Sequence, residues 1–364
     1  MLLKKLAALN KPLLLITTIL LIAGLYCIYS ATWMRETHFL RSQCFWLLFS
    51  LPIFFITSFT HYRWIKLGAT PLYLLALAAL LLVLVLGVKV YGARSWLNLG
   101  FCHFQPSELA IIAGIMLLSL FLSTSEKRHP LLRILLSTTI VALPCLLILV
   151  QPNLGGAIVW LPVFFAMLYA ANIPARYLLT MLLLGAAFTP LMINFGMKPY
   201  QRDRITVFLD PSLDPQGAGW NINQSLNAIG SGGFWGKGFK APNTLNELGY
   251  LPSTIVHNDF IFSVLGEEHG FFGSSLLLLL FVLLIFLGLF IAMKAADTLG
   301  RLLAVGIVFL FFTHTFMNIG MTIGVTPITG LPLPLVSYGG SFMIVAMLSL
   351  GLLQSVWIHR KLLY

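Results

Sequence analysis

Charged side chains are scarce in this sequence. Asp, Glu, Lys and Arg together make up 9% of its 364 residues, whereas soluble domains carry about 25%. Hydrophobic residues make up 59%, and one soluble domain of this length has too little interior to bury so many apolar side chains. The same figures exclude a disordered chain, a collagen-like chain and a coiled coil. The composition therefore predicts a protein that crosses a membrane several times.

Cysteine is scarce too. The chain has four cysteines, Cys27, Cys44, Cys102 and Cys145, and no CxxC pair. This excludes a disulfide scaffold and a cysteine-ligated metal site. Acidic residues number 11 against 22 for Lys and Arg, which gives a net charge of +11. We expect most of this charge to face anionic lipid at the cytoplasmic surface, and nothing in its pattern indicates nucleic acid as a partner.

Long apolar runs dominate the rest of the chain. A helix needs about 20 apolar residues to cross the hydrocarbon of a bilayer. The runs here are continuous rather than alternating, which favours helices over barrel strands. We expect an all-α polytopic membrane protein, a single membrane domain over residues 1–364, with about ten transmembrane helices. They are predicted at residues 13–31, 44–59, 67–88, 108–122, 134–150, 155–171, 178–195, 271–293, 302–324 and 341–358, with the second and fourth the shortest.

The Lys and Arg residues orient these spans. With the N-terminus inside, 13 of the 22 lie on the cytoplasmic side and 9 outside, and five of those nine lie in one long loop. The positive-inside rule counts short loops only, so it favours cytoplasmic positions for both termini. The long loop, at residues 196–259 between the seventh and eighth helices, is then extracytoplasmic. Loops of that length usually carry function.

The acidic residues are biased to the outer side. Nine of the eleven fall outside or near the outer membrane face, and Glu126 and Asp297 lie inside. Asp259 is the most informative, because it lies where the polar loop meets an apolar helix. A carboxylate at that boundary is costly to desolvate and indicates a functional site, although a helix-capping role is the alternative. Glu267 and Glu268 follow two helical turns later, so one of them is expected near the same face.

Basic residues on the outer side suit an anionic substrate. Guanidinium groups donate paired hydrogen bonds to phosphate, although arginines at helix ends also extend to the interface. Lys237 lies in a glycine-rich stretch at residues 230–238, whose amides either surround a pyrophosphate or form a plain turn. Glu108 opens the fourth span, where it suits the helix dipole as well as a functional role. The arginines are Arg41, Arg94, Arg202 and Arg204.

Residues 326–341 connect the last two spans. Three prolines and three glycines exclude a regular helix, yet almost nothing in this segment is charged. Irregular backbone at membrane depth is tolerated where it lines a cavity or is buried in protein. We therefore expect this segment to enter the outer leaflet and to form part of a pocket wall.

Six sequence motifs cover nearly the whole chain. In chain order they are Phe104-Gln105-Pro106-Ser107-Glu108, Gln151-Pro152-Asn153-Leu154-Gly155, residues 200–239, His257-Asn258-Asp259-Phe260-Ile261-Phe262 with Glu267-Glu268, Asn318-Ile319-Gly320-Met321 and Pro332-Leu333-Pro334-Leu335-Val336-Ser337-Tyr338-Gly339-Gly340-Ser341. Together they resemble the SEDS family (shape, elongation, division and sporulation) of peptidoglycan glycosyltransferases, and the motifs in the long loop resemble the elongation type of the family rather than the division type.

This resemblance implies a site on the outer side of the cytoplasmic (inner) membrane, with Asp259 as the essential carboxylate. It implies undecaprenyl-pyrophosphate-linked substrates, above all lipid II. The implied partners are a class B penicillin-binding protein transpeptidase and other elongation-complex membrane proteins. Many relatives carry a lysine at Ile111 and an aspartate at Asn153, so the basic side of this pocket must rely on other residues. The candidate substrate-binding residues are Arg41, Arg94, Gln105, Glu108, Arg202, Arg204, Lys237, Glu268 and Ser337.

The implied reaction polymerises lipid II into glycan strands. We expect Asp259 to take the proton from the GlcNAc 4-hydroxyl, a step that contributes about 10²–10⁴-fold, and the transfer to invert the donor linkage. A divalent cation, Mg²⁺ or Mn²⁺, suits the departing pyrophosphate, although the sequence does not locate a metal site, and no organic cofactor is expected. The alternatives are a lipid II flippase, which needs a polar path across the membrane, and a non-catalytic scaffold for the transpeptidase.

Overall fold

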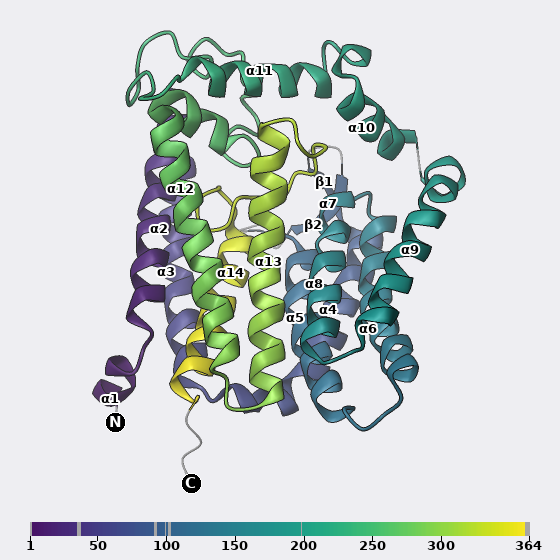
Figure 1. Cartoon of the computed structure of the whole chain (residues 1–364). Helices are drawn as coiled ribbons and strands as arrows, with labels where there is room; N and C mark the ends of the chain where they lie inside the picture. The colour runs from purple at the N-terminus through teal and green to yellow at the C-terminus, as the bar shows by residue number, and fades with distance from the viewer. Residues whose placement is uncertain are drawn as a thin grey trace.

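The long apolar runs fold as helices, because backbone N–H and C=O groups in lipid need partners within the same segment. The computed structural model describes residues 2–34, 38–90, 93–98, 100, 103–197 and 199–360. The helices stand side by side, with α1 and the end of α14 at one end of the bundle (Figure 1). The helices are α1 Leu2–Ala7, α2 Lys11–Thr32, α3 His38–Phe59, α4 Ile65–Leu86, α5 Pro106–Thr124, α6 Pro130–Val150, α7 Leu154–Ile158, α8 Trp160–Ala170, α9 Ala175–Leu191, α10 Pro199–Leu209, α11 Ala218–Ser231, α12 Ile261–Met293, α13 Thr298–Thr322 and α14 Gly340–Ile358.

Eight helices in the described residues are long and apolar enough to cross a membrane. They coincide with the first five and the last three predicted spans. The second and fourth spans, predicted to be the shortest, are helices of 22 and 19 residues. The polytopic helical class is therefore confirmed, whereas the count of ten stays a prediction.

The predicted sixth and seventh spans are occupied by shorter apolar helices, Leu154–Ala170 and Ala175–Leu191. The first is divided into α7 and α8, and Asn153 caps its start by accepting a hydrogen bond from Gly156 N at 2.9 Å. The second passes at its end into one turn of π-helix, Met192–Gly196. Both helices lie within a few residues of the predicted bounds, and the division into α7 and α8 and the π-helical turn are features that the hydrophobic pattern did not predict.

Residues between α4 and α5 form a small antiparallel sheet that the all-helical prediction did not include. Strand β2, Ala93–Asn98, pairs on one side with β1, Val88–Val90, and on the other with β3, His103–Phe104. Side chains of a strand point alternately to opposite faces. The sheet therefore directs Ser95 toward the protein interior and leaves Arg94 exposed.

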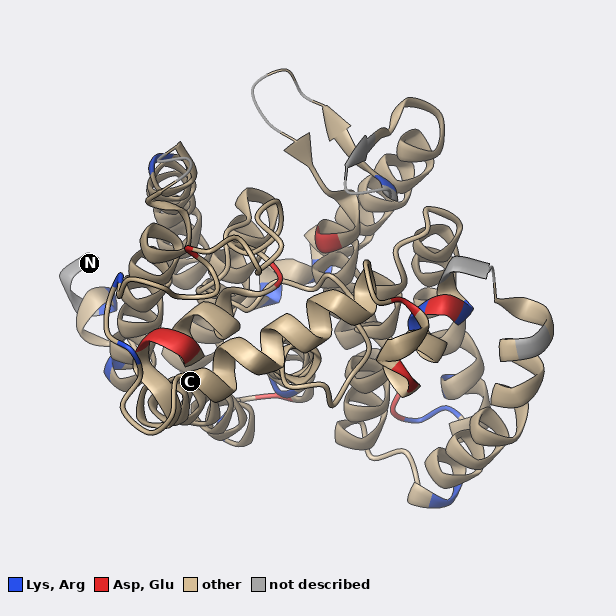
Figure 2. Ribbon diagram, turned by 90° about the horizontal axis from the view of Figure 1, so that it is seen from above, with Lys and Arg blue, Asp and Glu red and all other residues tan. Residues whose placement is uncertain are grey.

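The long connection between α9 and α12 is largely ordered. It contains α10, the short 3₁₀ helix Pro211–Leu213 and α11, which lie across the end of the bundle opposite α1 (Figure 1). Seen from above, Lys, Arg, Asp and Glu occupy only short stretches of ribbon (Figure 2). The helices most enclosed by protein are α5, α13 and α14, and the connection between α13 and α14 packs against residues 257–259 before α12 and against the start of α5.

Candidate active site

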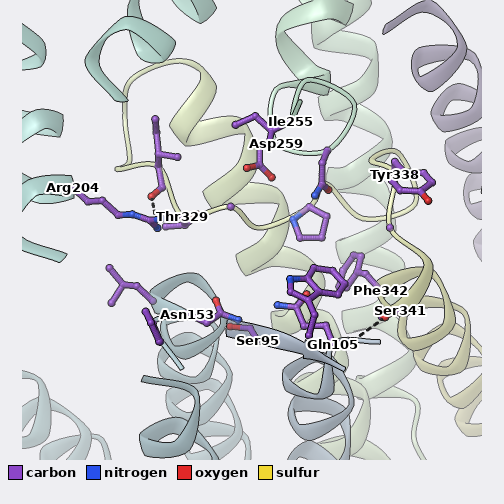
Figure 3. Close-up of a pocket in the computed structure, with 18 residues that line it drawn as sticks. Ser95, Gln105, Asn153, Arg204, Ile255, Asp259, Thr329, Tyr338, Ser341 and Phe342 are labelled. Atoms are coloured by element: carbon purple, nitrogen blue, oxygen red, sulfur yellow. Dashed lines mark hydrogen bonds between the residues drawn. The ribbon is translucent and has the colours of Figure 1, made fainter. Parts of the chain in front are cut away.

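A cavity of about 210 Å³ lies where the α13–α14 connection meets the starts of α5 and α7. Its walls come from β2, the start of α5, the start of α7, α10, the turn before α12 and residues 328–342 (Figure 3). The predicted pocket wall in residues 326–341 is therefore confirmed. Its lining includes Ser95, Trp96, Gln105, Asn153, Arg204, Asn258, Asp259, Thr329, Tyr338 and Ser341.

Asp259 enters this cavity from the turn that precedes α12. Its side chain points toward the wall that carries Ser95, Gln105 and Asn153 (Figure 3). The residue is 8% exposed, and its Oδ1 atom has no hydrogen-bond partner in the described part of the chain. Burial raises the pKa of Asp259 to about 7, and the positive charge of Arg204 partly opposes this rise. The carboxyl group can therefore gain or lose a proton near neutral pH.

Hydrogen bonds hold the Asp259 turn against the α13–α14 connection. Asn318 Nδ2 donates to Asp259 O at 3.2 Å and to Leu331 O at 2.8 Å. Ser337 Oγ donates to Asn258 O at 2.5 Å and accepts from Leu333 N at 2.9 Å. These bonds join two segments that are far apart in the sequence, and they fix the position of the backbone that carries the Asp259 side chain.

Ser337 was predicted to bind substrate, but its geometry indicates a supporting role. The residue is 4% exposed and is not among those that line the cavity. Both hydrogen bonds of its hydroxyl group go to backbone atoms. The prolines around it leave backbone groups without helical partners, so a hydroxyl that can both donate and accept is used to satisfy them.

Of the four predicted arginines, Arg204 lines the cavity. Its Nη1 atom donates to Ile328 O at 3.2 Å (Figure 3). Arg202, two residues earlier on α10, is exposed, because residues at i and i+2 of a helix point to different faces. Arg41 on α3 and Arg94 on β2 are exposed as well and lie outside the lining.

Lys237 and Glu268, which were predicted to bind substrate, also lie outside the lining of this cavity. Lys237 Nζ forms an ion pair with Glu267 Oε1 at 2.6 Å. Glu268 Oε1 accepts from Lys240 N at 3.3 Å and from Ser30 Oγ. The amides of Lys237 and Gly238 donate to carbonyls of α12 at 3.0 and 2.9 Å. The glycine-rich stretch therefore attaches the long loop to α12, and these amides do not face the cavity.

The start of α5 separates two predicted residues. Gln105 lines the cavity, and its backbone N–H donates to Ser341 Oγ at 3.1 Å. Glu108 is 3% exposed, lies one turn further along and does not line the cavity. Its Oε2 atom has no hydrogen-bond partner in the described chain. Ile111, in the second turn of α5, is fully buried and adds no charge here.

A family model described as "Cell cycle protein", which covers FtsW, RodA and SpoVE, matches residues 9–362. The chain belongs to the FtsW/RodA/SpoVE family. This is the SEDS family that the motifs resembled, and its members include proteins named for cell-shape and sporulation functions.

Individual members of the family are similar to this protein over most of its length. The peptidoglycan glycosyltransferase MrdB of Escherichia coli (strain K12) is 41% identical over 81% of this chain and 79% of its own length. The peptidoglycan glycosyltransferase RodA of Treponema pallidum is 32% identical over 94% and 96%. A solved structure of a peptidoglycan synthase complex that coordinates polymerization and crosslinking contains a chain 32% identical, with a TM-score of 0.81 over 97% of this chain and 99% of that one. The rod shape determining protein RodA of Thermus thermophilus is 29% identical, with a TM-score of 0.73 over 97% and 98%.

Some cavity residues of this SEDS-family chain were not predicted as site residues. Ser95 and Trp96 were missed because residues 88–104 carried no strand prediction, although the alternation of Arg94 and Ser95 was the available signal. Asn153 lines the cavity and also caps α7, and its Nδ2 atom donates to Ser107 Oγ at 3.4 Å. An amide can make both contacts at once, since it carries a donor and an acceptor.

An apolar groove of about 560 Å³ lies beside the cavity. It runs between α6, the α7–α8 segment and the turn from α9 into α10, and Leu154 lines both the groove and the cavity. Gly155 allows α7 to approach the α13–α14 connection here, because a Cβ atom at this position would lie 2.4 Å from Thr329 O. The polar cavity and the apolar groove of this SEDS-family chain therefore meet at the start of α7.

Proposed function

We infer that this protein is a peptidoglycan glycosyltransferase of the elongation type, which polymerises lipid II into glycan strands. The names of its relatives in Escherichia coli and Treponema pallidum support the activity. The single observation that carries the mechanism is the buried carboxyl group of Asp259, which lines a polar cavity and has one oxygen without a hydrogen-bond partner among the described residues.

Asp259 acts as the general base. It takes the proton of the GlcNAc 4-hydroxyl of lipid II, and the hydroxyl oxygen attacks the anomeric carbon of the glycan chain carried on undecaprenyl pyrophosphate. Attack opposite the leaving group breaks the bond to pyrophosphate and inverts the linkage. A pKa of about 7 suits this step, because a base is most effective when its pKa lies near the working pH.

Arg204 stabilises the departing pyrophosphate. Negative charge grows on that group as the bond breaks, and a fixed cation in a partly enclosed site stabilises it without reorganisation. Arg204 is well placed for this, since it lines the cavity that holds Asp259 and is already oriented by its bond to Ile328 O.

A divalent cation fits this chemistry. Within the described residues no group of three or more His, Cys, Asp or Glu residues surrounds a metal position. Asn258 Oδ1 is a buried oxygen without a hydrogen-bond partner in the described part of the chain, and Asn258 lines the cavity. Mg²⁺ keeps several waters and takes much of its coordination from substrate phosphates. Asn258 would hold the cation through its amide oxygen together with those phosphates, and the cation, when bound, would neutralise charge on the pyrophosphate, while the Asp259 carboxylate stays available for the proton.

The apolar groove suits an undecaprenyl tail. The groove is lined mainly by aliphatic and aromatic side chains and reaches the cavity at Leu154. A lipid-linked substrate could therefore keep its tail in the membrane region while its sugar and phosphates enter the cavity. This arrangement explains why the carboxyl group lies at the end of a helix bundle.

The site faces outward and the protein works with a transpeptidase. The cavity is lined by residues of α7 and α10, which lie toward the end of the bundle opposite α1 and the end of α14 (Figure 1), and this position supports cytoplasmic termini in the inner membrane. The related chain in the peptidoglycan synthase complex that coordinates polymerization and crosslinking supports a class B penicillin-binding protein as partner. Other elongation-complex membrane proteins belong to the same proposal.

Polymerisation of purified lipid II tests the role of Asp259. Asp259→Asn should abolish glycan strands on a gel while the protein remains folded, since the amide is similar in size but cannot take the proton. Asp203→Asn on α10 is the matched control, because Asp203 is exposed and lies outside the cavity lining. Wild-type polymerisation by Asp259→Asn would remove it from the role. Loss of lipid II movement across liposomes instead would favour a flippase.

A further inference from the structure

A second cavity lies at the opposite end of the bundle from the proposed active site. It has a volume of about 380 Å³ and lies between the α1–α2 junction, the last turns of α12 and the end of α14 (Figure 1). Leu287 and Phe290 of α12 and Trp357 of α14 form apolar walls. None of the proposed catalytic or substrate-binding residues lines it.

Positive charge surrounds this cavity. Lys11 and Arg360 line it, and Lys294 Nζ lies 5.8 Å from the ring centroid of Phe290, one of its wall residues. The guanidinium group of Arg360 stacks 3.7 Å from the ring centroid of Trp357, which orients it at the rim. In the described part of the chain, no Asp or Glu lines this cavity.

Two acidic residues are expected on this side: Glu126 lies in the exposed α5–α6 connection and does not line the cavity, and Asp297 is already paired. Asp297 accepts hydrogen bonds from Tyr62 Oη at 2.8 Å, from Arg63 Nε at 3.0 Å and from Gly300 N at 2.9 Å. It therefore does not neutralise the cavity. Three positively charged side chains therefore lie at or near an apolar cavity, and a bound anionic group would balance their charge.

The depth of the cavity points to a lipid. Leu287 and Phe290 belong to the last turns of α12, an apolar helix that ends at Met293 and is followed by Lys294. The change from apolar helix to lysine marks the level where hydrocarbon gives way to headgroups. The cavity therefore offers apolar walls at acyl-chain depth and cations at phosphate depth.

We propose that this cavity binds an anionic glycerophospholipid. Its phosphate headgroup lies between Lys11 and Arg360, and an acyl chain packs against Leu287 and Phe290. Basic pockets between transmembrane helices are suited to such headgroups. A zwitterionic lipid is a poorer match, because its own positive charge already balances its phosphate.

Titration with phosphatidylglycerol tests the proposal. The full-length protein in a neutral detergent is titrated with phosphatidylglycerol, or with phosphatidylcholine of the same acyl chains, and the bound lipid is counted by native mass spectrometry. Lys11→Gln combined with Arg360→Gln should weaken phosphatidylglycerol binding roughly 30-fold, taking about 1 kcal/mol for each cation. Phosphatidylcholine binding should not change.

Lys127→Gln combined with Arg128→Gln is the matched control. It removes the same charge from the exposed α5–α6 connection at the same end of the bundle (Figure 1) and should leave phosphatidylglycerol binding within about twofold, since screened surface charges contribute little. Equal losses in the two double variants, or none in the Lys11 and Arg360 variant, would overturn the proposal.

Two further measurements separate a lipid from a free anion. Ala8→Trp fills the cavity without changing charge and should reduce phosphatidylglycerol binding, since Ala8 lines it. Inorganic phosphate should not compete with the lipid, because it lacks the acyl chain. Effective competition by inorganic phosphate alone would identify a free-anion site and contradict the proposal.

Discussion

At the scale of single residues, Asp259 determines how activity should depend on pH. Burial raises the pKa of this carboxyl group to about 7, so a growing fraction is protonated below that pH. A protonated carboxyl cannot act as a base, so the polymerisation rate should fall by about tenfold for each pH unit below the pKa. Initial rates of lipid II polymerisation measured across pH check this profile.

Arg204→Gln provides the control for that profile. Arg204 holds the pKa of Asp259 down, so its removal should move the midpoint of the profile to higher pH. An unchanged midpoint would show that a group other than Asp259 sets the pH profile.

The folding stability should change with pH in the opposite direction to the activity. The pKa of Asp259 in the folded protein lies above its ordinary value, so the stability that comes from the neutral carboxyl group is present at low pH and is lost as the pH rises through about 7. Asp259→Asn should therefore melt at least as high as wild type above pH 7.

Ser337 distinguishes a supporting residue from a substrate-binding one. Ser337→Ala removes the donor to Asn258 O and the acceptor for Leu333 N, which leaves two buried backbone groups unpaired. Displacement of Asp259 should lower kcat by about 10–100-fold with little change in KM for lipid II. Ser337→Thr keeps a hydroxyl and should recover most of the rate. An increase in KM alone would restore the substrate-binding assignment.

At the scale of elements, a break in α12 attaches the long loop to the bundle. Gly270 has φ +62° and ψ −157°, which interrupts the helix. The interruption frees two carbonyls and two amides, and residues 233–238 bond to all four: Phe271 N donates to Gly233 O at 2.8 Å and Phe272 N to Phe234 O at 3.0 Å, while Glu267 O and Glu268 O accept from Lys237 N and Gly238 N. The loop therefore supplies the hydrogen-bond partners that the break in α12 leaves without helical partners.

Gly270→Ala tests this attachment. A Cβ atom at this position would lie 2.4 Å from Gly236 N, and the positive φ is unfavourable for alanine. We expect a loss of about 1–3 kcal/mol in stability and faster protease cleavage in residues 232–240. Gly230→Ala is the control, since its Cβ atom would meet nothing within 4 Å. Equal melting temperatures and cleavage rates for the two variants would contradict the role of the break.

At the scale of the whole molecule, the apolar groove adjoins the polar cavity, so the affinity for a substrate should depend on the length of its lipid tail. Met192→Trp adds bulk at an exposed position that lines the groove, whereas Leu184→Trp adds it to an exposed position of α9 outside the groove. The first variant should raise KM for undecaprenyl lipid II several-fold and change KM little for a short-chain analogue, because the short chain need not occupy the groove. Equal effects on both substrates would argue against tail binding there.

The sequence alone determined the membrane class, the bounds of most helices and the position of Asp259 at the start of an apolar helix. These properties follow from local runs of side chains, which choose helix in lipid without help from distant parts of the chain. The division of the sixth span into α7 and α8, the π-helical turn after α9 and the small sheet escaped prediction, since these features depend on local backbone geometry and strand pairing that the hydrophobic pattern does not record.

Only the tertiary structure decided which polar residues share a cavity. It brought Arg204 to Asp259 and left Arg202 exposed, turned Ser337 toward backbone, and placed Lys237 and Glu268 at the attachment of the loop to α12 and α2. Convergence of this kind depends on how α10, α13 and α14 pack, and it joins positions more than a hundred residues apart. A local sequence pattern indicates which residues can bind a phosphate, but which of them lie close together depends on how the whole chain packs.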